Sequence, residues 1–279
     1  MPMKLSLSVR VAESFSDKTR ATLSLERLAD LAVEHGYAAL CMRASQVGIH
    51  APADLARAAA EQIRRRGLAV SMVTGDFPIP QNNDESPAAL RNITPYLDLA
   101  AALDADLLRI SMKSALDIPH AQRAADEATE RGMRLAHQCH TRSLFEQVDL
   151  ALEVVRRVGR RNFGIIYEPA NLETCREEYG AATIRRLAPW MFNVYLQNQR
   201  AAADGPETAD TWARGPFRFH HVPMWDPRGL DFAAVLTALE EISYDGYVTI
   251  HQAFAGLNGA AEAAARSAAY LRTLGRFDR

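Results

Sequence analysis

Short apolar runs recur along the chain, and each is followed by a longer stretch with apolar residues at helical spacing. Runs of this length, bounded by glycine, proline or polar clusters, are typical of strands buried in a parallel sheet. Their recurrence every roughly 27 to 38 residues is the spacing of strand-then-helix repeats. We expect strands at Lys4–Val9, Ala38–Arg43, Leu68–Thr74, Asp106–Met112, Met133–Gln138, Phe163–Glu168, Met191–Gln197 and Tyr247–His251.

The stretches between these runs predict amphipathic helices. In the first of them Ser24 is a candidate N-cap and Gly36 a candidate C-cap. A polar loop at Pro78–Glu85 precedes the third helix. We expect helices at Ser24–Gly36, Pro52–Gly67, a stretch ending near Ala102, Ile118–Gly132, Ser143–Gly159, Glu178–Leu187, Leu230–Ile242 and Leu257–Leu274.

Eight strand-then-helix units predict a closed (β/α)8 barrel, the TIM barrel, formed by residues 1–279 as one domain. The alternative is an open doubly wound sheet. No glycine fingerprint follows the first strand, which disfavours that alternative and also a nucleotide cofactor. The segment Asn198–Gly229 has no clear periodicity but is rich in aromatic residues and histidine. We expect it to form a long loop over the barrel mouth, as a lid or pocket wall.

Composition limits the classes of partner. The formal net charge is −2 and the pI about 6.5, so we expect neither nucleic acid nor a membrane surface as a partner. The three cysteines are scattered, which predicts neither a disulfide framework nor a thiolate zinc site. The sequence starts directly with a strand pattern, without a signal-peptide core, so a cytoplasmic protein is expected. The sequence does not decide whether the chain forms a homo-oligomer.

Polar side chains follow the predicted strands at their carboxyl ends, where barrel enzymes build their active sites. Glu168 is the strongest candidate because it ends a buried run immediately before a proline. His140 and His251 are candidate proton carriers or ligands. His137 would face the other side of the pleat, which favours a structural role. Candidate substrate-binding residues are Arg43, Lys113, Gln197, His221 and Trp225.

Several motifs resemble the sugar phosphate isomerase/epimerase family, within the xylose isomerase-like barrel superfamily that also holds the endonuclease IV enzymes. The resemblance covers nearly the whole chain. The motifs are Gln138-Cys139-His140, Tyr167-Glu168-Pro169-Ala170-Asn171, Tyr195-Leu196-Gln197-Asn198, Val222-Pro223-Met224 before Gly229-Leu230-Asp231-Phe232, and Gly246-Tyr247-Val248-Thr249-Ile250-His251.

The resemblance implies a divalent metal such as Mn, Zn or Mg, held by Glu, Asp, His and Glu from strands five to eight. In this chain Gln138, Glu168, Tyr195 and His251 take those positions, so one carboxylate remains. The candidate metal ligands are therefore Gln138, Glu168 and His251. A site with one carboxylate, one imidazole and one amide is weak, and the sequence leaves metal binding open.

The resemblance also implies an enzyme that isomerises or epimerises a sugar or another polyhydroxy carbonyl compound by abstracting a proton next to the carbonyl. Glu168, His140 and His251 are its candidate catalytic residues. Two alternatives stay open: a metal-free lyase of the same fold, and a barrel that binds a sugar-like ligand without the ancestral chemistry. Repair of DNA in the manner of endonuclease IV is disfavoured because most of the needed metal ligands are missing.

Overall fold

Eight parallel strands form a closed barrel in the computed structural model, which describes residues 2–13, 17–253 and 259–278. The ring closes because β1 pairs with β11 as well as with β2, with Leu7 opposite both Ile250 and Leu40. The predicted (β/α)8 barrel is therefore confirmed, and each strand lies within two residues of its predicted bounds. The strands are β1 Met3–Ser8, β2 Ala39–Arg43, β3 Ala69–Thr74, β4 Leu107–Ile110, β5 Arg134–Gln138, β6 Phe163–Tyr167, β7 Met191–Leu196 and β11 Tyr247–Ile250.

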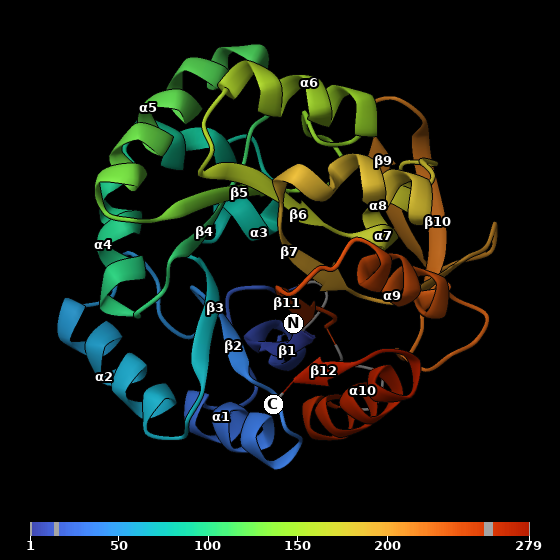
Figure 1. Cartoon of the computed structure of the whole chain (residues 1–279), viewed down its shortest axis with the longest axis horizontal. Helices are drawn as coiled ribbons and strands as arrows, with labels where there is room; N and C mark the ends of the chain where they lie inside the picture. Colours follow the sequence, from blue (N-terminus) through green and yellow to red (C-terminus); the bar gives the residue numbers. More distant parts are fainter. Residues whose placement is uncertain (1, 14–16, 254–258, 279) are drawn as a thin grey trace.

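Helices surround the strands as an outer ring (Figure 1). Ser24 caps the first of them, since its hydroxyl accepts a hydrogen bond from the Arg27 amide at 3.2 Å. The predicted start of the last helix, at Leu257, lies outside the described residues. The ring helices are α1 Leu25–Glu34, α2 Ala53–Arg64, α4 Thr94–Ala102, α5 Ile118–Glu130, α6 Val148–Val158, α8 Ala181–Leu187, α9 Phe232–Glu241 and α10 Ala260–Leu274.

Short elements at the strand ends complete the barrel. The loop expected at Pro78–Glu85 begins instead with one helical turn, α3 Pro78–Gln81, and α7 Pro169–Thr174 follows β6 directly. A final strand, β12 Phe277–Asp278, pairs with β1. None of the helices in the described part of the chain is both long and apolar enough to cross a membrane.

The barrel interior is layered, because alternate residues of each strand point inward. Polar pairs occupy one layer, such as Ser6 with Ser71 at 2.7 Å and Thr249 with Asn193 at 3.0 Å. The next layer is mainly apolar. Above it, at the carboxyl ends of the strands, charged side chains face one another. The apolar layer consists of Cys41, Met72, Leu107, Ala136, Ile166 and Tyr195.

The segment expected as a long loop, Asn198–Gly229, contains an antiparallel sheet of β8 Gln199–Ala201, β9 Glu207–Thr211 and β10 Gly215–His221. Every second side chain of β9 is exposed, as in a strand with one face toward solvent. This strand was not predicted from the sequence. The sheet lies at the right-hand edge of Figure 1. The Glu146 carboxylate accepts hydrogen bonds from the backbone amides of Trp212 and Ala213, which fixes its hairpin to the loop after β5.

Asn198 joins the end of β7 to the turn before α9. Its amide nitrogen donates to the carbonyl of Pro223 at 2.9 Å, and its oxygen accepts from the Leu230 amide at 2.9 Å. The turn passes so close to Asn198 that a Cβ on Gly229 would lie 1.9 Å from the Asn198 side-chain oxygen. Only glycine fits there without a shift of the Asn198 side chain.

Candidate functional site

A small cavity of about 30 Å³ lies at the barrel mouth, where the strand ends converge. A hollow of about 710 Å³ lies at the other end of β2 and β3, beside α1 and α10. Parallel barrels bind substrates at the carboxyl ends of their strands, so the mouth is the candidate site despite its size. It is lined by Arg10, Lys18, Arg43, Pro80, Arg109, Gln138, His140, Glu168, Asn171, Gln197 and His251.

Glu168 is fully buried and ends β6 inside this cavity. One carboxylate oxygen, Oε2, accepts hydrogen bonds from the side-chain amides of Gln138 and Asn171. The other oxygen, Oε1, has no hydrogen-bond partner. Burial raises the pKa of Glu168 to about 7, although the Gln138 amide and the nearby Arg109 and Arg10 charges act to lower it. A carboxylate with one free oxygen and a pKa near neutrality is suited to take and return a proton.

Two residues from the end of β5 stand beside it. Gln138 donates to Glu168 through its nitrogen, and its own oxygen is unpartnered. His140 also lines the cavity, and its Nδ1 lies 3.1 Å from the carbonyl of Thr141, so Nδ1 carries the proton and Nε2 is free to accept. Burial keeps the pKa of His140 well below its usual range. His137 points away, as expected, and stacks on Phe145.

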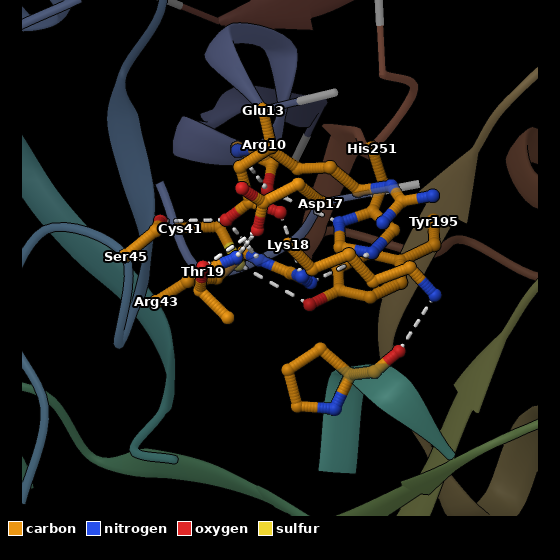
Figure 2. Close-up of polar contacts among 12 residues, drawn as sticks. Arg10, Glu13, Asp17, Lys18, Thr19, Cys41, Arg43, Ser45, Tyr195 and His251 are labelled. Atoms are coloured by element: carbon orange, nitrogen blue, oxygen red, sulfur yellow. Dashed lines mark hydrogen bonds and ion pairs between the residues drawn. The ribbon is translucent and has the colours of Figure 1, made fainter. Parts of the chain in front are cut away.

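A buried network on the opposite side of the mouth holds Arg43. Its guanidinium donates to Glu13 Oε1 at 2.8 Å and forms a second contact with Glu13 Oε2, and Ser45 donates to the same carboxylate (Figure 2). Arg43 Nη1 also lies 3.5 Å from Nε2 of His251. His251 stacks on Tyr195, with the ring centroids 3.7 Å apart.

Three cationic side chains at the mouth were missed in the sequence. Arg10 lies two residues beyond the end of β1, and Arg109 lies within β4. The side chains of Arg10 and Arg109 are only 6% and 4% exposed. Lys18 reaches the mouth from the loop after β1 and donates to the carbonyl of Pro80 at 2.8 Å. Burial lowers the pKa of Lys18 to about 7, aided by the positive charges of Arg10 and Arg43. The sequence did indicate Arg109, because an arginine within an otherwise apolar strand is almost never buried unless it is paired.

Several predicted substrate-binding residues lie away from the cavity. The Lys113 ammonium donates to the carbonyls of Asn82 and Arg142, so it anchors loops. Trp225 lies under the guanidinium of Arg266 at 3.9 Å. His221 packs edge-on against Phe219 and is not part of the cavity lining. None of these three side chains lines the cavity in this structure.

The seventh strand also needs a correction. Tyr195 lies one layer below the mouth, where its hydroxyl contacts the Cys41 sulfur at 3.2 Å. Gln197, two residues further on, lines the cavity. The position next to Gln138, Glu168 and His251 is therefore held by Gln197. The cavity brings together Arg43, Gln138, His140, Glu168, Gln197 and His251 from the predicted set.

Comparison with known proteins identifies the family. Residues 29–274 match the family model described as xylose isomerase-like TIM barrel. The chain belongs to this family. Comparison of this xylose isomerase-like chain with curated proteins found no match.

Solved structures of the family superpose over almost the full chain. A xylose isomerase domain protein from Planctomyces limnophilus has a TM-score of 0.72 at 16% identity, covering 98% of this chain and 96% of its own. The probable 3-DHS dehydratase AsbF, involved in petrobactin synthesis in Bacillus anthracis, has a TM-score of 0.71 at 14% identity, covering 97% and 99%. A D-allulose 3-epimerase from Methylomonas sp. has a TM-score of 0.66 at 14% identity, covering 98% of each chain. Identities this low establish the shared fold alone.

The metal set implied by the xylose isomerase-like resemblance does not fit this mouth. Within residues 2–13, 17–253 and 259–278, no group of three or more His, Cys, Asp or Glu side chains is placed to hold an ion. A guanidinium only donates, so Nε2 of His251 accepts from Arg43 and Nδ1 donates to Ser8 at 3.1 Å. Both imidazole nitrogens are thus engaged, and Arg10 and Arg109 would repel a dication. We derive no step through a metal.

Proposed function

We propose that this protein is an enzyme that abstracts a proton next to the carbonyl of a polyhydroxy carbonyl compound, and so isomerises or epimerises it without a resident metal. The observation that carries the proposal is Glu168. It is a fully buried carboxylate at the barrel mouth with one free oxygen and a pKa of about 7. Family membership supports the reaction class, since epimerases and a dehydratase share the fold.

The reaction follows from the groups around that oxygen. Oε1 of Glu168 takes the proton from the carbon next to the carbonyl, and the electron pair of the broken C–H bond moves onto the carbonyl oxygen. The resulting enediolate is anionic, and the positive charge of Arg109 stabilises it. Gln138 and Asn171 hold Oε2, so that Oε1 stays aimed at the substrate. Glu168 then returns the proton to the other face of the same carbon, which gives the epimer. Alternatively it returns the proton to the neighbouring carbon while the proton of the adjacent hydroxyl moves to the former carbonyl oxygen, which gives the isomer.

Substrate entry must enlarge the mouth. A cavity of about 30 Å³ has the volume of one water molecule in the liquid and is too small for a sugar. The contact between Lys18 and Pro80 joins the loop after β1 to α3 across the opening. We therefore expect this contact to break when substrate enters.

Elimination is the second candidate, because it shares the first step and differs only in whether the anion then expels a hydroxyl from the next carbon. Product analysis separates the two reactions: isomers or epimers conserve the formula, whereas a lyase releases water. A barrel that only binds its ligand would give no exchange of carbon-bound hydrogen with solvent.

The test is solvent-deuterium exchange followed by ¹H NMR, with protein dialysed against EDTA and a panel of ketoses, aldoses and their acidic and phosphorylated forms. For the substrates that exchange, Glu168→Gln should lower the rate at least 100-fold, because loss of a general base typically costs 10² to 10⁴. The control is Glu130→Gln, a change of the same kind at an exposed position of α5. Full exchange by the Glu168 variant would refute the proposed base, and exchange that requires added Mn²⁺ or Zn²⁺ would refute the metal-free reaction.

A further inference from the structure

The barrel mouth holds more positive charge than its carboxylates balance. Arg43 is matched by Glu13 through two contacts. Arg10 and Arg109 have no such partner: no carboxylate among the described residues forms an ion pair or hydrogen bond with either. The nearest negative charge in the cavity lining is the single carboxylate of Glu168, which Gln138 and Asn171 already bond.

The unmatched guanidiniums are also unsatisfied as hydrogen-bond donors. The Nε atoms of Arg10 and Arg109 are both buried without an acceptor. Each of the two side chains is more than nine-tenths buried and lines the cavity. Burying an unpaired charge is costly, so a fold retains such groups where a ligand completes them. Guanidinium groups match the oxygens of carboxylate and phosphate groups, which accept paired hydrogen bonds from them.

We infer that the barrel mouth contains an oxyanion-binding site formed by Arg10 and Arg109, with Lys18 at its rim, and that the substrate is a polyhydroxy carbonyl compound carrying a carboxylate or phosphate. This inference rests on the proposed function for the rest of the substrate, but the site itself follows from the charges alone. The anionic group would lie in the cavity beside Glu168, and so fix the orientation of the carbon chain relative to Oε1.

The experiment is isothermal titration calorimetry at low ionic strength with two matched pairs of probes: D-glucuronate against D-glucose, and D-ribose 5-phosphate against D-ribose. We expect the anionic member of at least one pair to bind about tenfold tighter or more, since hydrogen bonds from a guanidinium to a charged oxygen are stronger than those between neutral groups. Preference in the first pair identifies a carboxylate site and preference in the second a phosphate site; both support the inference. Equal binding within both pairs overturns it.

Variants assign the site to its residues. Arg109→Met, which keeps an unbranched side chain and removes the charge, should abolish the preference, and Arg109→Lys should restore part of it. Arg161→Met is the control, because Arg161 is exposed before β6 at the other end of the barrel. An undiminished preference in Arg109→Met would overturn the assignment. If that variant does not fold, the salt dependence of the wild type decides: the preference must fall as salt rises, and a preference indifferent to salt refutes the site.

The same titration separates this inference from the proposed function. Glu168→Gln removes a negative charge from the cavity, so it should bind the anionic probe at least as tightly as the wild type while losing exchange. If exchange persists in that variant but the anion preference is present, the proposed base is wrong and the oxyanion site stands. If exchange is lost but neither anion is preferred, the base stands and the site is wrong.

Discussion

Glu168 gives a prediction that needs no substrate. Its pKa is raised from the ordinary 4.5 to about 7 by burial. The folded protein therefore holds this proton more tightly than the unfolded chain, and the folded state loses stability as the pH rises from 4.5 to about 7. Below that range both states are protonated, and above it the loss is complete. Glu168→Gln removes the titration, so the variant should gain stability relative to the wild type as the pH rises.

The expected size follows from the two pKa values. A carboxyl group moved from 4.5 to about 7 loses about 3 kcal/mol of stability when fully ionised. Most of that range falls between pH 5 and pH 8, where the difference in unfolding free energy between variant and wild type should change by about 2.5 kcal/mol. For a chain of this length the change corresponds to about 4 °C in the difference between the two melting temperatures.

The assay is thermal unfolding of both proteins in buffers from pH 5 to pH 8, followed by circular dichroism. Buried histidines titrate in both proteins and cancel in the difference. Glu130→Gln, the same substitution at an exposed position of α5, is measured beside it as the control. A flat difference for Glu168→Gln would mean that the carboxylate is solvated or paired in solution, and would remove the physical basis for its role as a base.

Three further predictions concern the rate and the packing of the mouth. For a substrate that exchanges, kcat/KM should rise with pH through an apparent pKa near 7, because Glu168 must be ionised; a profile flat from pH 5.5 to 8 would contradict this. Arg43→Met should destabilise the protein by about 3 to 5 kcal/mol in chemical denaturation, because it leaves Glu13 buried and unpaired. The double variant with Glu13→Gln should recover part of this loss. An equal loss in the single and the double variant would show that charge pairing is not the cause. Gly229→Ala should lower the free energy of unfolding by about 1 to 3 kcal/mol, because the new Cβ clashes with the Asn198 side chain. In the double variant with Asn198→Gly, the loss of stability should be smaller than the sum of the two single losses. Additive losses would show that the strain does not come from this contact.

The barrel was predictable from the sequence because parallel strands buried on both faces are continuous apolar runs. Phe163–Tyr167 is such a run, and proline and glycine mark its surroundings. The β8–β10 sheet was not predictable by the same rule. Its β9, Glu207–Thr211, is half exposed and contains glutamate, aspartate and three residues of weak apolar character, so its two-residue period is faint.

The candidate site was predictable where a residue directly ends a strand, as Gln138 and His251 do. It was not predictable where position along the strand decides the depth in the barrel. Lys113 shares its parity with Arg109, yet it lies beyond the mouth and binds loop carbonyls, whereas Arg109 is inside. Tyr195 was assigned one layer too high for the same reason. A sequence pattern gives the side of the strand on which a residue lies, but the tilt and stagger of strands in a closed barrel set its height.

The substituted ligand positions and the unmatched arginines have one electrostatic explanation. The resemblance implies carboxylates and a dication at the mouth, so that positive charge is supplied by the ion and balanced by the protein. Here Gln138 and His251 are uncharged in the places of carboxylates, and Arg10 and Arg109 supply the positive charge from the barrel itself. An enediolate needs positive charge next to its oxygen, whatever the source. On the proposal above, the mouth binds an anionic substrate in place of a dication. The substituted metal-ligand positions and the oxyanion site are then two consequences of the same reversal of charge.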